Sequence, residues 1–73
     1  MFNVNDEVIV SENIFPESTD LNDIKFRGQR GLVALRMWEV MNNPAGEWDG
    51  CYQVDLIDGD FVYVNENEIW LVP

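Results

Sequence analysis

The chain contains no histidine and only one cysteine, Cys51. Histidine is the commonest general base near neutral pH, and without an imidazole neither Cys51 nor the serines have the partner that usually activates a nucleophile. A single thiol cannot close a disulfide within the chain, and no cluster of cysteines and histidines offers zinc its preferred ligands. From these absences we expect a non-enzymatic protein with no cofactor and no metal.

Positive charge is scarce as well. Four Lys and Arg stand against fourteen Asp and Glu, which gives a net charge of −10 at pH 7. All four cations lie in the stretch KFRGQRGLVALR, residues 25–36. Such a charge repels nucleic acid and anionic membranes and attracts cationic surfaces. We therefore expect basic proteins as partners and no direct binding to nucleic acid or membrane; simple solubility is the alternative reason for the acidity.

Long hydrophobic runs are also missing, and the N-terminal stretch MFNVNDEV is acidic rather than basic. On these grounds we expect neither a signal peptide nor a membrane anchor, and a cytoplasmic location. The apolar content of 47%, with three Trp, four Phe and two Tyr, is too high for a disordered acidic tail. We expect one folded domain over residues 1–73, monomeric when free.

Alternating apolar and polar residues predict the first strands. DEVIVSE places Val8 and Val10 on one side of the chain, as in a half-buried strand. Gly28 and Gly31 then predict a tight turn before LVALRMWEV, residues 32–40, which favours a second strand. A helix over this second segment is the alternative, because Leu, Ala, Arg, Met and Glu all favour helices.

A hairpin is predicted late in the chain. CYQVDLI alternates cleanly, and Asp-Gly at 58–59 is typical of a two-residue hairpin turn. With such a turn Leu56 pairs with Phe61 and Val54 pairs with Tyr63. The two aromatic rings are therefore expected to join the core.

The remaining segments predict loops, one helical turn and a closing strand. Residues 42–50 form a loop by composition, NENE at 65–68 predicts a single helical turn, and IWLV predicts the last strand, with Trp70 partly in the core. Short strands at regular spacing favour a small barrel, which has no exposed edges. The polar segment 11–26 is expected to fold back onto this barrel through apolar anchors, namely Ile14, Phe15, Leu21, Ile24 and Phe26.

The order of these segments resembles the SH3-like barrel over nearly the whole chain. The resemblance rests on VNDEVIV, FRGQRGLV, YQVDL and VNENEIWLV, and the GxxGxV element also looks like the strand entry of KOW-type domains. It implies an all-β fold, a single five-stranded SH3-like barrel with a long first loop and a short helical turn before the last strand. Because this superfold hosts many unrelated tasks, the fold alone assigns no function.

Within that group the chain is most similar to the CarS-type antirepressors, at FRGQRGLV, at QV and at the closing ENEIWLVP. Those proteins are acidic and occupy the DNA-reading surface of a repressor, with carboxylates standing in for phosphates. The resemblance therefore implies an inhibitor or antirepressor that mimics nucleic-acid charge. The chain is also similar in length, strand order and the ENEI turn to the variable subunit of ferredoxin-thioredoxin reductase and to PsaE of photosystem I, which implies an accessory subunit as the alternative.

The candidate binding surface is drawn from the C-terminal half of the chain. Alternate residues of a strand are about 6.6 Å apart, so outward carboxylates can form rows at a spacing similar to that of successive phosphates. Trp48 lies in a turn-rich loop and is the candidate hydrophobic anchor, although local packing is the commoner role for such a ring. We expect a basic nucleic-acid-binding protein to contact Glu47, Trp48, Asp49, Asp55, Asp58, Asp60, Glu66 and Glu68.

The basic segment has a structural interpretation. Lys25, Arg27 and Arg30 are expected to hold the acidic loop of residues 12–23 near the barrel, as local counter-charges to the surrounding carboxylates. A nucleic-acid-binding patch is the alternative, and the net negative charge argues against it.

Overall fold

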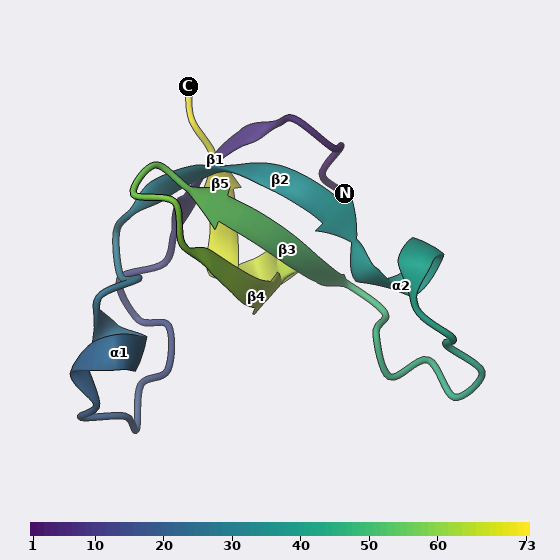
Figure 1. Cartoon of the computed structure of the whole chain (residues 1–73), viewed down its shortest axis with the longest axis horizontal. Coiled ribbons are helices and arrows are strands. Elements are labelled where there is room, and N and C mark those ends of the chain that lie inside the picture. The colour runs from purple at the N-terminus through teal and green to yellow at the C-terminus, as the bar shows by residue number, and fades with distance from the viewer.

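The computed structural model describes residues 1–73, which form one five-stranded antiparallel sheet with short helical turns in its connections (Figure 1). The strands are β1 (Glu7–Val10), β2 (Arg30–Arg36), β3 (Cys51–Leu56), β4 (Phe61–Asn65) and β5 (Ile69–Leu71). The helical pieces are α1 (Leu21–Ile24), α2 (Met37–Val40) and the 3-10 turn η1 (Glu66–Glu68). None of the helices has the length and apolar character needed to cross a bilayer.

The strand order in the sheet is β4-β3-β2-β1-β5. The expected five strands are therefore confirmed, as is the helical turn before the last of them. The strands at the two ends of this order, β4 and β5, are not paired with each other, so the curved sheet in Figure 1 is not closed and the expected barrel is not confirmed.

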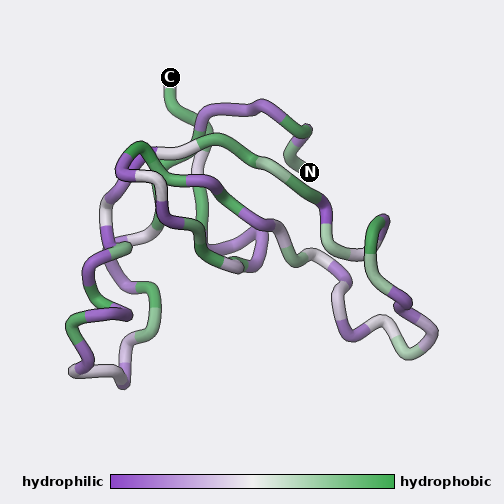
Figure 2. The backbone as a smooth tube through the Cα atoms, viewed as in Figure 1, coloured by the Kyte–Doolittle hydropathy of each residue, from purple (hydrophilic) through white to green (hydrophobic).

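The core lies on one face of the sheet. Burial alternates along β1, β3 and β4, as the two-residue period of a strand requires. Figure 2 shows changes between hydrophobic and hydrophilic colour along β3. The core cluster comprises Val8, Val10, Ile14, Val33, Tyr52, Val54, Leu56, Val62, Val64 and Ile69.

The loop of the β3–β4 hairpin is one residue longer than predicted. The amide of Gly59 donates to the carbonyl oxygen of Leu56 over 3.0 Å, and Gly59 has a φ of 91°. The amide of Leu56 in turn donates to the carbonyl oxygen of Asp60 over 2.8 Å. Residues 57–59 therefore form a three-residue loop, in which a tight turn is followed by a glycine with positive φ.

The longer loop changes the register of β4. Val54 pairs with Val62 instead of Tyr63. A shift of one residue turns every side chain of a strand to the other face, so the predicted register was wrong. Val62 and Val64 are buried in the core, whereas Phe61 and Tyr63 remain 49% and 45% exposed on the outer face.

The second strand is shorter than predicted and contains one of the two glycines. β2 ends at Arg36, where the one-turn helix α2 begins. Gly28, with a φ of 72°, lies in the turn before β2 as expected. Gly31 lies within the strand, where a Cβ atom would be only 2.4 Å from the carbonyl oxygen of Asp55. It is therefore needed for the close approach of β2 and β3 rather than for a turn.

The long connection between β1 and β2 folds back onto the sheet as expected. Ile14 is buried, and the rings of Phe15 and Phe26 meet edge to face with centroids 6.5 Å apart. Two apolar predictions were wrong: Leu21 is 76% exposed and does not anchor the loop, and Trp70 on β5 is 54% exposed.

Candidate protein-binding surface

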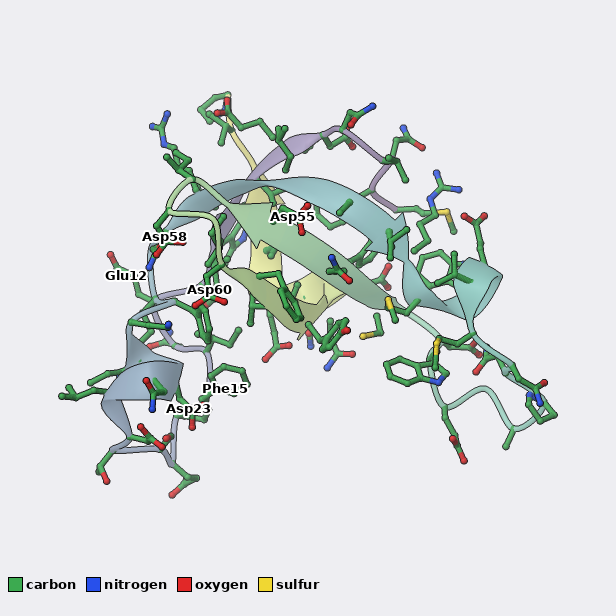
Figure 3. The ribbon with its side chains drawn as sticks, in the orientation of Figure 1. Glu12, Phe15, Asp23, Asp55, Asp58 and Asp60 are labelled. Carbon is green, nitrogen blue, oxygen red and sulfur yellow. The ribbon has the colours of Figure 1, made fainter.

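The β3–β4 hairpin separates the predicted contact residues into two groups. Asp55, Asp58 and Asp60 lie near its turn, and Figure 3 shows Asp55 on the face of β3 with the other two at the turn end. The second group, Glu47, Trp48, Asp49, Glu66 and Glu68, lies at the opposite end. There the amide of Glu66 donates to the carbonyl oxygen of Gly50 over 2.9 Å. Five residues of strand span roughly 17 Å, which sets the separation of the two groups.

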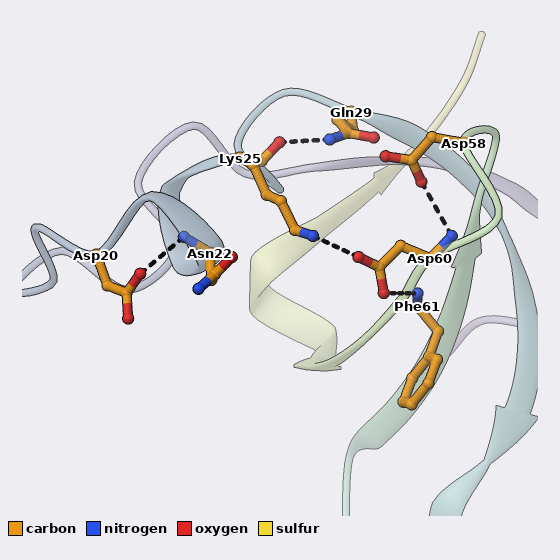
Figure 4. Close-up of polar contacts among 7 residues, drawn as sticks. All are labelled: Asp20, Asn22, Lys25, Gln29, Asp58, Asp60 and Phe61. Carbon is orange, nitrogen blue, oxygen red and sulfur yellow. Dashed lines mark hydrogen bonds and ion pairs between the residues drawn. The ribbon is translucent and has the colours of Figure 1, made fainter.

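At the turn end, Asp60 is engaged by the protein itself (Figure 4). Its Oδ2 atom forms an ion pair with Nζ of Lys25, and its Oδ1 atom accepts the amide of Phe61 over 2.9 Å. The hydrogen bond from Lys25 lowers the pKa of the Asp60 carboxyl, and the amide of Phe61 acts in the same direction. The same contact raises the pKa of Lys25. Asp58 accepts the amide of Asp60 over 3.0 Å and so shapes the turn.

At the opposite end, Glu68 has a structural role. Its Oε1 atom accepts the amide of Asn65 over 2.7 Å, which caps the start of η1. The half-buried Cys51 lies nearby, and burial raises the pKa of its thiol, with a further contribution from the negative charge of Glu68. Both effects favour the protonated thiol over the thiolate.

The carboxylates of Asp60 and Glu68 also protect the free edge of β4. At one end of the β3–β4 ladder the amide of Leu56 donates to the carbonyl oxygen of Asp60, and at the other end the amide of Glu66 donates to that of Gly50. Hydrogen-bonded residues alternate along an antiparallel pair, so the even-numbered residues of β4 are the ones that bond to β3. The odd-numbered amides then point to the free edge of the sheet. Edge amides are templates for unwanted strand pairing unless they are blocked.

Two of the three edge amides of β4 are satisfied by side chains. The amide of Phe61 donates to Asp60 and that of Asn65 donates to Glu68. Tyr63, between them, is the edge residue whose amide has no side-chain acceptor. Asp60 and Glu68 were predicted as partner contacts. In the structure both carboxylates accept hydrogen bonds from edge amides of β4.

Three aromatic rings form a continuous row on the exposed side of β4. Trp48 meets Tyr63 with centroids 6.2 Å apart, and Tyr63 meets Phe61 with centroids 5.5 Å apart, both edge to face. The Trp48 backbone is held by Asn43, whose Oδ1 atom accepts its amide over 2.8 Å. Asn43 also donates from Nδ2 to Asp49 over 2.8 Å, which orders the loop. We refer to Trp48, Tyr63 and Phe61 as the aromatic row.

Of the three rings, only Trp48 was predicted as a contact from the sequence. Phe61 and Tyr63 were expected in the core because a two-residue turn was predicted, and the observed register places them outside it. The alternation in FVYV is compatible with either register, since the valines can fill the core as well as the aromatics. The length of the turn was the missing information.

The cations of the basic segment have different roles. Arg27 donates to the carbonyl oxygens of Ile14 and Phe15, so it holds the long loop through backbone atoms rather than carboxylates. Lys25 binds the hairpin turn through Asp60. Arg30 is exposed and forms no side-chain hydrogen bond or ion pair, so the prediction that it holds the loop was wrong.

The acidic groups of the surface form no metal-binding cluster, and three of the predicted contacts among them are unpaired. No three carboxylate or thiol groups are gathered where they could hold a metal ion. Three of the predicted contact carboxylates are exposed and form no ion pair: Asp55, Glu47 and Glu66.

The chain matches no protein-family model, no curated protein and no solved structure.

Proposed function

We propose that this protein is a non-enzymatic, acidic binding module that occupies the nucleic-acid-binding surface of a basic protein, as an inhibitor or antirepressor. One observation carries the proposal: of the fourteen carboxylates, only Asp60 and Glu39 form ion pairs. The net charge of −10 is therefore left almost uncompensated over a small surface. A basic groove or helix is attracted to such a surface at long range, and salt screens the attraction.

The local positions of the acids support this role. Asp55 lies exposed on β3, where its carboxylate accepts a hydrogen bond from Gln53 over 3.0 Å and has no cationic partner. Glu47 and Glu66 are exposed at the other end of the hairpin. These carboxylates are free to accept hydrogen bonds from the arginines and lysines that otherwise contact phosphates.

The fold is compatible with the same proposal. The five antiparallel strands and the 3-10 turn directly before β5 agree with the elements that an SH3-like fold implies, and the resemblance to the acidic CarS-type proteins rests on the sequence motifs. We propose a cytoplasmic setting, as the composition of the chain predicts, with a DNA-binding protein as the partner.

The test is affinity capture from the native cell extract, followed by competition. We expect added duplex DNA to displace the partner, and the affinity to fall steeply between about 50 mM and 200 mM salt, because the interface is built on charge. A partner with no nucleic-acid-binding surface would contradict the proposal.

A matched pair of charge variants locates the surface. Asp55→Asn combined with Glu66→Gln removes two charges beside β3 and β4, whereas Glu12→Gln combined with Glu17→Gln removes two from the long loop. We expect the first pair to weaken capture of the partner more than the second. Equal losses would mean that net charge, rather than this face, governs binding.

An accessory subunit of a larger enzyme complex is the second candidate. It is favoured by the exposed apolar residues of the edge strand β5, where Trp70 and Leu71 are 54% and 57% exposed. An interface built on these side chains is apolar and survives both DNA competition and raised salt. The same experiment therefore separates the two functions.

A further inference from the structure

The aromatic row lies in a surrounding of negative charge. Phe61 pairs directly with Asp55 across the strands, so a carboxylate lies beside one end of the row. Beyond the other end, Trp48 is flanked in sequence by Glu47 and Asp49. Phe61 and Tyr63 are 49% and 45% exposed, so their rings present adjoining apolar surface on the outer face of the sheet.

None of the four cations of the chain lies over a ring of this row; Arg30 is exposed and forms no cation–π contact with these rings. Lys25 is directed to Asp60 and lies over the ring of Phe26, with Nζ 5.1 Å from its centroid. Arg27 and Arg36 are bound to backbone carbonyl oxygens elsewhere. The electron-rich faces of the three rings and the neighbouring carboxylates therefore attract a cation from outside the molecule.

We propose that the aromatic row is the docking site for arginine side chains of a basic polypeptide. A guanidinium group is planar and weakly hydrated, so it can stack on an aromatic face while it donates hydrogen bonds to a carboxylate such as Asp55. Lysine has a compact, strongly hydrated ammonium group that does only part of this. The inference rests on the proposed function, and it specifies where the partner is anchored and which cation it presents.

The spacing of the row suits an extended segment. Neighbouring ring centroids are 5.5 and 6.2 Å apart. Side chains on the same side of an extended peptide are about 6.6 Å apart, so arginines at alternate positions match successive rings. The occupant is therefore an extended stretch with alternating arginines.

The experiment uses two synthetic probes and the full chain. One probe is a short peptide of alternating arginine and serine, and the other has lysine in place of every arginine. Binding is measured by calorimetry and by the NMR shifts of the Tyr63 and Phe61 rings. We expect the arginine peptide to bind several-fold more tightly and to move these resonances. Equal affinity of the two peptides, or no binding of either, would overturn the inference.

Variants on the exposed strand face test the row directly. Phe61→Thr with Tyr63→Thr keeps residues that favour a strand and removes two rings. We expect this double variant to lose about 2- to 30-fold in affinity for the arginine peptide, with little change for the lysine peptide. The matched control is Trp70→Thr, which removes an exposed ring from β5. A double variant that binds as the control does, with a wild-type thermal melt, contradicts the inference.

The two proposals fail in different ways. If duplex DNA displaces the natural partner and the aromatic variants still bind that partner normally, the proposed function stands and the arginine site is wrong. If the natural partner has no nucleic-acid-binding surface but the arginine peptide binds the row, the docking site stands and the proposed function is wrong.

Discussion

Arg27 donates a hydrogen bond from Nη2 to the carbonyl oxygen of Phe15 over 2.8 Å, and Phe15 has a φ of 52°. The same guanidinium donates from Nε to the carbonyl oxygen of Ile14 over 2.9 Å. A positive φ costs a residue other than glycine roughly 1–2 kcal/mol. Charge-assisted bonds to two successive carbonyl oxygens offset this strain, so Arg27 sets the path of the long loop between β1 and β2.

Replacing Arg27 should therefore destabilise the protein. We expect Arg27→Ala to lower the free energy of unfolding by about 2 kcal/mol, because hydrogen bonds from a charged, partly buried group are lost. Chemical denaturation measures the change, and hydrogen exchange should show faster opening of residues 13–19. Arg30→Ala is the control, since Arg30 is exposed and unpaired, and we expect a change within about 0.5 kcal/mol. Equal effects of the two variants would contradict the role of Arg27.

The ion pair between Lys25 and Asp60 predicts a pH dependence in acid. The folded state lowers the pKa of Asp60, first through Lys25 and then through the amide of Phe61. Its contribution to stability is therefore complete above the ordinary Asp pKa of about 4 and is lost as the pH falls through the lowered value. We expect Lys25→Met to move the Asp60 pKa back toward the ordinary value in an NMR titration of its carboxyl carbon. Arg30→Met, which removes one cation elsewhere, should leave that titration unchanged.

The sequence predicted the local elements well. Alternation identified β1, β3 and β4, and NENE identified the turn η1, because both depend on short-range periodicity and capping. The extent of β2 and the register of β4 were predicted wrongly. Both depend on contacts between strands, such as the approach of Gly31 to Asp55, which no local pattern encodes.

The candidate site was predicted less completely. Composition was enough to predict an acidic surface, and a turn-rich loop was enough to single out Trp48. The pattern did not show that Asp60 and Glu68 satisfy edge amides, because those contacts require the positions of the turn and of η1. It also missed the two rings beside Trp48, since a shift of one residue decides which side of β4 is exposed.

The register of β4 can be tested with two substitutions to the same residue. Val64 is buried and Tyr63 is 45% exposed. Val64→Thr keeps the shape but places a hydroxyl in the core, so we expect a loss of about 1–3 kcal/mol. For Tyr63→Thr on the outer face we expect a loss below about 1 kcal/mol. Denaturation midpoints in the reverse order would restore the register in which the aromatics are buried.

The last prediction concerns the close contact between β2 and β3. A Cβ atom on Gly31 would lie 2.4 Å from the carbonyl oxygen of Asp55, which is a backbone atom and cannot rotate away as a side chain can. We expect Gly31→Ala to force the strands apart and to lower the free energy of unfolding by about 3 kcal/mol. Gly59→Ala is the comparison: nothing lies within 4 Å of its added Cβ, and only its positive φ is unfavourable, at about 1 kcal/mol. A Gly31→Ala protein as stable as Gly59→Ala would mean that β2 and β3 do not approach this closely.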